Sequence, residues 1–146
     1  MISLPDVNVL LALAWSNHVH HEAAHRWFAA ESALGWATCL PTQSGFVRLS
    51  LNPQVVGTQL SAEAVLALLD ALVAHPQHQY FADHPALIAP TFKTIGTMIR
   101  GYRQASDAVL LHLARHHGAK LVTFDQAVRT ICPWSENLAV ITNSST

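Results

Sequence analysis

Cysteine and charge are both scarce in this sequence of 146 residues. Its two cysteines, Cys39 and Cys132, lie far apart and outside any CxxC spacing, which argues against a zinc ribbon or a disulfide scaffold and favours a reducing compartment. We interpret both as small core residues. Charged residues make up only 12% of the chain and the net charge is −1, so there is no global basic field to attract nucleic acid. A polyanionic substrate would have to be held locally, by a metal ion and a few arginines.

Long apolar runs are missing as well. No stretch reaches the roughly 18 apolar residues that a membrane span needs. The apolar run at the N-terminus has no basic region before it and is interrupted by Pro5, Asp6 and Asn8, which excludes a secretory signal. Repeats and low-complexity linkers do not occur. Because 51% of the residues are hydrophobic, we expect one compact domain over residues 1–146, located in the cytoplasm.

The segment 106–125 places a carboxylate at each end of one structural unit. Asp107 opens a predicted amphipathic helix, and Gly118 ends it. Residues 120–124 have the β-branched and aromatic content of a buried strand, and Asp125 lies just past its end. In an open parallel α/β sheet, the ligand crevice lies outside the carboxyl ends of the strands. Both carboxylates are therefore predicted to reach the same crevice.

A third carboxylate occupies an equivalent place at the start of the chain. A brief strand that begins at Ile2 ends at Asp6, so Asp6 repeats the position of Asp125. Three carboxylates at one sheet edge would repel one another and raise one another's pKa values. A divalent cation relieves this repulsion, because Mg²⁺ takes oxygen ligands from one or two carboxylates and keeps several waters. We therefore predict a metal site at this edge.

Each acid also has a simpler interpretation. Asp107 could cap the helix that it opens, and Asp125 the turn that follows it, since Asp is a favoured N-cap residue. For a single Asp, capping is the more common explanation. The occurrence of three acids at such positions, with Asn8 two residues after Asp6, favours the metal site.

The remaining predicted elements alternate in the same α/β manner. Helices are expected at residues 21–30, 42–51, 61–73 and 91–98, strands at 35–39, 78–81 and 138–141, a loop at 54–59 and a helical turn at 126–131. His21 and His25 share one helix face, but a zinc site would need further ligands at motif spacing. We interpret these histidines as surface residues or as packing beside Trp27.

The order of these motifs resembles that of a known family. The likeness is carried by Asp6-Val7-Asn8-Val9-Leu10-Leu11-Ala12, His21-x-x-Ala24-x-x-Trp27, Thr42-Gln43-Ser44-Gly45-Phe46-Val47-Arg48, Ser106-Asp107-Ala108 and Thr123-Phe124-Asp125. Together these segments resemble the PIN-domain ribonucleases and, more narrowly, the VapC-type toxins of bacterial toxin–antitoxin pairs. The likeness covers nearly the whole chain.

The resemblance implies a Rossmann-like α/β/α domain with a central, mainly parallel sheet flanked by helices. It implies an endoribonuclease that uses Mg²⁺ or Mn²⁺, and a homodimer held inactive by a small VapB-like antitoxin that also binds DNA. By position, Asp6, Asp107 and Asp125 match the family's acidic, metal-binding site. Asn8 matches the polar residue after the first acid, and Ser106 the hydroxyl residue beside the second.

One position departs from the family pattern. Many members have a Glu on the helix after the second strand, where this chain has Gln43. Gln can ligate a metal or bind its water but adds no charge, so one-metal and two-metal catalysis both stay open. In either case a metal at Asp6 and Asp107 would activate a water and polarise the scissile phosphate, and a second ion near Asp125 would stabilise the leaving 3′ oxygen.

Alternatives stay open for the residues that contact phosphate and for the function. Arg48, Arg100 and Arg103 are candidates for phosphate contacts, because guanidinium groups suit phosphate oxygens, but each could equally be a surface or antitoxin-facing residue. A phosphohydrolase of the haloacid dehalogenase type would need a second Asp at position 8 and a mobile cap. Gln43 gives some weight to another alternative, a non-catalytic PIN-like module that binds metal or RNA and acts through antitoxin association.

Overall fold

A fully parallel sheet forms the centre of the molecule. The computed structural model describes residues 1–143. The sheet has five strands in the order β3-β2-β1-β4-β5, and each pair of neighbours runs in the same direction. The strands are β1 (Ser3–Pro5), β2 (Trp36–Cys39), β3 (His78–Phe81), β4 (Lys120–Thr123) and β5 (Leu138–Val140). The arrangement confirms the predicted Rossmann-like α/β class.

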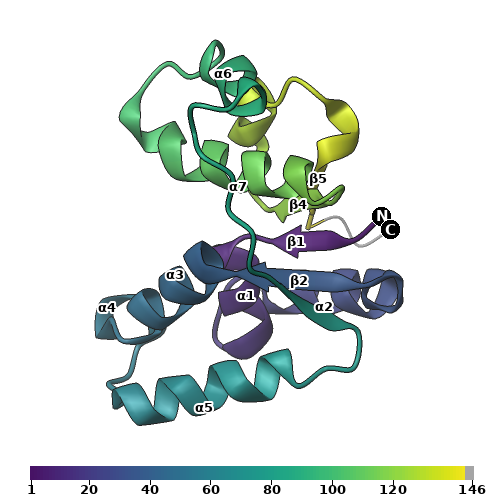
Figure 1. Cartoon of the computed structure of the whole chain (residues 1–146). Helices are drawn as coiled ribbons and strands as arrows, with labels where there is room; N and C mark the ends of the chain where they lie inside the picture. Colours follow the sequence, from purple (N-terminus) through teal and green to yellow (C-terminus); the bar gives the residue numbers. More distant parts are fainter. Residues whose placement is uncertain (144–146) are drawn as a thin grey trace.

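Helices cover both faces of the sheet (Figure 1). They are α1 (Val7–Ala14), α2 (His21–Glu31), α3 (Leu40–Ser50), α4 (Pro53–Val56), α5 (Ala62–Val73), α6 (Pro90–Gly96) and α7 (Ala105–His116). Helices α6 and α7 lie on one face, and α1, α2, α3 and α5 lie on the other (Figure 1). None of the helices among residues 1–143 is long and apolar enough to cross a bilayer.

Each face has its own apolar core. On the side of α6 and α7, Leu4 and Leu121 from the sheet pack with Leu111. On the opposite side, Trp36 packs with apolar residues of α1, α3 and α5. Residues of β1 and β2 are buried throughout, because a parallel strand with helices on both faces has no solvent-facing side. This burial makes the central strands a rigid support for the residues that follow them.

Predicted and observed elements agree to within a few residues, with two differences. The short helix α4 occupies part of the predicted loop 54–59. It forms because Pro53 suits the first turn of a helix and the side chain of Asn52 accepts a hydrogen bond from the Gln54 amide at 3.0 Å. Helix α7 begins at Ala105, so Asp107 lies inside its first turn and does not open it.

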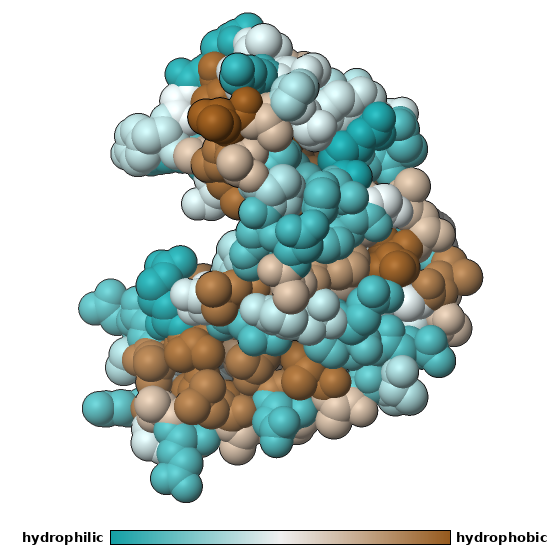
Figure 2. Space-filling view, in the orientation of Figure 1, coloured by the Kyte–Doolittle hydropathy of each residue, from teal (hydrophilic) through white to brown (hydrophobic). Residues whose placement is uncertain are grey.

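An apolar patch lies over α3 and α5 on the surface (Figure 2). There the two helices form an open groove of about 530 Å³, lined by Leu40, Gln43, Ser44, Val47, Arg48, Leu51, Leu66 and Leu69. Leu40 and Leu66 are each more than half exposed. Asp6 and Asp125, which follow β1 and β4, do not line this groove.

Candidate active site

The strand order creates a crevice at the carboxyl ends of β1 and β4. The chain moves from β1 to β2 and β3 on one side, then crosses back to β4 on the other side of β1. Such a reversal of strand order is where doubly wound α/β proteins bind ligands. The Asp6 amide donates a hydrogen bond to the Val122 carbonyl at 2.9 Å and so joins the two strands at this point.

Asp6 directly follows β1 and is only 6% exposed. One carboxylate oxygen, Oδ1, accepts a hydrogen bond from the Val9 amide at 3.0 Å and so caps α1. The other, Oδ2, accepts from the Thr123 hydroxyl at 2.6 Å. Burial raises the pKa of Asp6 to about 6, and the charge of Asp107 adds to the rise, while these hydrogen bonds oppose it.

Asp107 lies in the first turn of α7 and is half-buried. Burial raises its pKa, and the nearby charge of Asp125 raises it further. The residue at the N-cap position of α7 is Gln104, and within residues 1–143 the Asp107 carboxylate accepts no hydrogen bond from the helix. The simple capping interpretation is therefore wrong for Asp107.

Asp125 follows β4 and is exposed to solvent. Its Oδ1 accepts a hydrogen bond from the Ala127 amide at 2.9 Å and caps the short 3-10 helix Gln126–Ile131. This capping role, one of the two alternatives for Asp125, is confirmed. It occupies one carboxylate oxygen and leaves the other without a hydrogen-bond partner among the described residues.

Thr123 connects two of the acids and was not among the predicted site residues. Its hydroxyl donates to Asp6 Oδ2 at 2.6 Å and accepts from the Asp125 amide at 3.1 Å, and its side chain is fully buried. A signal was present in the sequence, because a Thr hydroxyl often binds the backbone amide of a residue two positions later. Thr123 stands two residues before Asp125, so a hydroxyl could be expected beside that acid.

The three acids carry negative charge that no basic side chain balances. Within residues 1–143, the two ion pairs are Arg115–Glu136 and His116–Asp83, and neither includes Asp6, Asp107 or Asp125. Burial is the main cause of the raised pKa values of Asp6 and Asp107; the charge of Asp107 adds to the rise at Asp6, and the charge of Asp125 adds to the rise at Asp107. Unpaired carboxylate oxygens are the donors that hard divalent cations prefer. The donor chemistry therefore fits such a cation.

The acids do not by themselves form a complete cage. Over the part of the chain that the structure describes, no group of three or more His, Cys, Asp or Glu side chains is arranged to hold a metal ion. Mg²⁺ does not require such a group, because it is usually held by one or two carboxylates and several waters. A cation at this edge would be bound in that way, with substrate oxygens completing its shell.

The other predicted polar residues lie in different surroundings. Asn8 is exposed in the first turn of α1, and Ser106 is exposed immediately before Asp107. The Gln43 side-chain amide donates a hydrogen bond to Thr38 Oγ1 at 2.9 Å. That hydroxyl also lies 2.8 Å from His78 Nε2, so Gln43 is tied to β2 and β3.

The three arginines also differ. Arg100 donates to the Thr97 carbonyl at 3.0 Å, and Arg103 donates to the Tyr102 hydroxyl at 3.3 Å, so both contact their own segment. Arg48 lies on α3 and faces a cavity beside the acids. Among these three, Arg48 is thus the one that lines the same cavity as Ser106.

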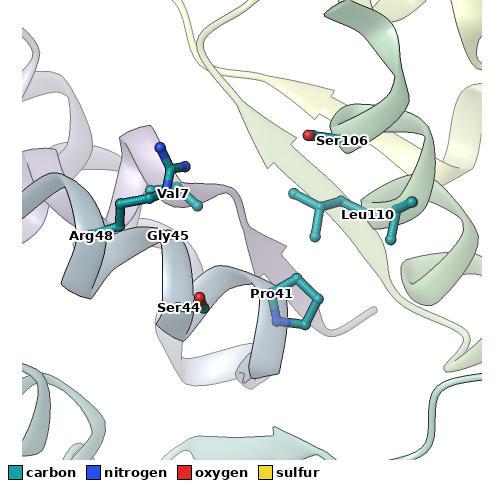
Figure 3. Close-up of a pocket in the computed structure, with 8 residues that line it drawn as sticks. Val7, Pro41, Ser44, Gly45, Arg48, Ser106 and Leu110 are labelled. Atoms are coloured by element: carbon teal, nitrogen blue, oxygen red, sulfur yellow. The ribbon is translucent and has the colours of Figure 1, made fainter. Parts of the chain in front are cut away.

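The cavity near Arg48 lies between α3 and α7. It encloses about 260 Å³ and is lined by Val7, Pro41, Ser44, Gly45, Arg48, Ser106, Val109 and Leu110. Figure 3 shows Ser44 and Arg48 on α3 facing Ser106 and Leu110 on α7. The molecular surface is hollowed between the parts that contain these two helices (Figure 2).

The paired histidines of α2 have structural partners. His21 Nδ1 lies 2.7 Å from the Ala12 carbonyl oxygen, and His25 Nε2 lies 2.9 Å from that of Leu13. Both rings therefore bind carbonyl groups at the end of α1 that have no partner inside the helix. Their structural interpretation is supported.

Two comparisons with known protein sequences agree on one family. The PIN domain matches residues 3–132. Ribonuclease VapC38 of Mycobacterium tuberculosis is 45% identical over 130 residues, which cover 89% of both chains. Ribonuclease VapC39 of the same species is 40% identical over 128 residues, covering 88% of this chain and 91% of that protein.

A solved structure supports the same fold. In the crystal structure of VapBC2 from Rickettsia felis bound to a DNA fragment from their promoter, one chain superposes with a TM-score of 0.65. The match covers 97% of this chain and 100% of that chain at 14% sequence identity. At this identity the likeness concerns the fold alone.

Proposed function

Because the chain belongs to the PIN-domain family and, within it, to the VapC ribonucleases, we propose that it hydrolyses RNA phosphodiester bonds with the help of a divalent cation held near Asp6, Asp107 and Asp125. Its function as the ribonuclease toxin of a toxin–antitoxin system follows from that family. The observation that carries the metal proposal is the set of neighbouring acids, unbalanced by any basic side chain of residues 1–143, at the point where the strand order reverses.

The residues of the site have distinct roles in this proposal. Asp6 and Asp107 hold the cation, and Asp125 adds its charge near Asp107. Thr123 fixes the orientation of the Asp6 carboxylate through its hydroxyl. When bound, Mg²⁺ or Mn²⁺ supplies a Lewis acid that activates water and stabilises charge on the phosphate. Hydrolysis by water leaves a 5′-phosphate and a 3′-hydroxyl.

We also propose the partners that the family implies. A VapB-like antitoxin is the expected inhibitor, since the chain belongs to the VapC ribonucleases. RNA is the substrate, the protein forms a homodimer, and it acts in the cytoplasm. Arg48 is the favoured phosphate contact among the three arginines, because it lies at the cavity that also contains Ser106.

A cleavage assay with matched Asp→Asn variants tests the proposed function. Wild-type protein should cut single-stranded RNA in Mg²⁺ or Mn²⁺ and lose this activity in EDTA. Asp6→Asn removes one charged ligand and should reduce the rate by roughly 100-fold. Asp70→Asn, at an exposed position on α5, should cut like the wild type.

Two outcomes would contradict the proposal. One is RNA cleavage by Asp6→Asn at the wild-type rate, and the other is the absence of cleavage by the wild type in either metal. The phosphohydrolase and the non-catalytic module both predict that the wild type leaves RNA intact.

A further inference from the structure

We propose that the cavity between α3 and α7 is a subsite for one unpaired nucleoside of the RNA, next to the bond that is cut. This inference rests on the proposed function, since it places substrate beside the acids. It assigns to the cavity a ligand of defined chemistry: a nucleobase with its sugar, followed by a phosphate.

The position of the cavity is the first argument. Val7 lines it and directly follows Asp6, while Ser106 lines it and directly precedes Asp107. Two of the residues that line the cavity are therefore direct sequence neighbours of two of the acids. The cavity therefore adjoins the acids, so a nucleoside in the cavity and a phosphate at the acids can belong to one substrate strand.

The chemistry of the lining is the second argument. Val7, Pro41, Val109 and Leu110 provide apolar walls for the faces of a base. The hydroxyls of Ser44 and Ser106 can each donate and accept, which suits the edge of a base. Neither hydroxyl, nor the Arg48 guanidinium, makes a hydrogen bond or ion pair within residues 1–143. These groups are therefore free to contact a ligand. An apolar cavity with a few polar groups is the usual form of a small-ligand site.

The size of the cavity is the third argument. Sites for drug-sized ligands usually enclose about 300–1,000 Å³. A cavity of about 260 Å³ has room for a single ring system. Sequence-selective proteins bind unpaired RNA bases that are splayed out of the strand. The cavity matches one such base.

Gly45 lets α1 and α3 pack closely at the floor of the cavity. A Cβ atom at this position would lie 2.5 Å from Val7 Cγ2, which is closer than atoms can approach. Helices α1 and α3 are therefore in direct contact under the cavity. The floor is formed before any ligand arrives, and a base that enters it loses little to rearrangement of the protein.

An apolar side chain of a protein partner is the competing occupant. The charge of the lining favours RNA, because among residues 1–143 Arg48 is the single charged residue that lines the cavity and no acidic residue does so. A cation at the rim attracts the phosphate that follows a base, whereas an apolar side chain needs no such charge.

The test combines a variant that fills the cavity with RNA that lacks single bases. Ser44 is exposed at the rim, so Ser44→Phe can fill the cavity while the fold is retained. Ala30→Phe, at an exposed position of α2 that does not line the cavity, is the control. The probe is a single-stranded RNA with one cleavage site, made as a series in which one nucleotide at a time is abasic.

The subsite predicts one position at which the wild type needs a base. There, an abasic nucleotide should raise KM about tenfold, with little change in kcat. Ser44→Phe should raise KM for the intact RNA by a similar factor. In this variant the abasic nucleotide should not raise KM further, because both changes remove the same contact between base and cavity. Ala30→Phe should behave as the wild type.

Three results would overturn the inference. The first is that the wild type cuts every abasic RNA with the same KM. This measurement uses the wild type alone, so it tests the subsite even if Ser44→Phe does not fold. Ser44→Phe could keep the full abasic penalty, which would place the base elsewhere. Ser44→Phe could weaken binding of the antitoxin while leaving KM for RNA unchanged, which would assign the cavity to the protein partner. If the wild type cuts no RNA at all, the proposed function fails together with the subsite.

Discussion

At the residue scale, the hydroxyl of Thr123 is the contact on which the geometry of Asp6 depends. This hydroxyl donates to the Asp6 carboxylate and accepts from the Asp125 backbone amide, and Asp6 is 117 residues away from Thr123 in the sequence. A hydrogen bond from a neighbouring side chain orients a metal ligand and supports its charged form. Thr123 is therefore a positioning residue for the proposed cation site.

Thr123→Val should weaken cation binding without disturbing the core. Val has nearly the shape of Thr but cannot donate to Asp6, so Mn²⁺ affinity should fall by about tenfold. Thr123→Ser keeps the hydroxyl and should retain most of the affinity. Calorimetric titration of the free protein with Mn²⁺ measures both effects. Equal affinity of the Val variant and the wild type would show that the hydroxyl does not support the site.

The raised pKa of Asp6 predicts a pH dependence of stability. Its pKa is about 6 in the folded protein and 3.8 for an unperturbed group, so between these values the folded state holds more protons than the unfolded state. Stability then decreases as the pH rises through this window. For cation-free protein, the contribution of Asp6 amounts to a loss of roughly 3 kcal/mol, because one pKa unit corresponds to about 1.4 kcal/mol.

Asp6→Asn should lack this loss. Urea unfolding in EDTA, from about pH 4 to about pH 7, should show the wild type losing more stability than the variant as the pH rises. Parallel pH profiles of the two proteins would mean that the folded pKa of Asp6 is not raised.

At the element scale, the contact between α1 and α3 depends on Gly45. Replacing it with Ala would put a Cβ atom 2.5 Å from Val7 Cγ2, so either the Val7 side chain or the two helices would have to shift. Overpacking of this kind costs about 1–3 kcal/mol. Gly45→Ala should therefore reduce the free energy of unfolding, as measured by urea denaturation.

Gly96 provides a control for the Gly45 variant. It ends α6 and has nothing within 4 Å of an added Cβ atom, so Gly96→Ala should leave stability nearly unchanged. If both variants lose stability equally, then the loss reflects a general property of Gly→Ala changes and not the contact with Val7.

Elements were predictable where their signals are local. Ser61 caps α5 through the Ala64 amide, and Gly118, with a φ of 65°, ends α7 as expected. The start of α7 was less predictable. The 3-10 turn Tyr102–Gln104 leads directly into the helix, so no capping side chain marks its first residue. The helix α4 was missed because four residues carry too little periodicity to distinguish a helix from a loop.

At the scale of the whole molecule, a cation should couple the sheet and α7. Asp6 and Asp125 follow strands, while Asp107 lies on a helix packed against the sheet. A ligand that binds only the folded state stabilises it by mass action. At a concentration of about 100 times its Kd, Mn²⁺ should raise the Tm of the wild type by about 5 °C or more.

Asp107→Asn separates repulsion from cation binding. In EDTA it should raise the Tm, because it removes one of the interacting charges. It should also largely abolish the rise that Mn²⁺ produces in the wild type, whereas Asp70→Asn should keep that rise. An equal response to Mn²⁺ in the wild type and Asp107→Asn would place the cation away from α7.

The sequence by itself determined the elements and the positions of Asp6, Asp107 and Asp125 along them, because apolar periodicity, Gly and Pro act over a few residues. Only the tertiary structure decided which of these positions meet. It places β4 beside β1, brings Thr123 to Asp6, turns Gln43 toward Thr38 and leaves a cavity between α3 and α7. These contacts join residues from different elements, and their geometry follows from the order of the strands and the packing of both cores, which no local pattern specifies.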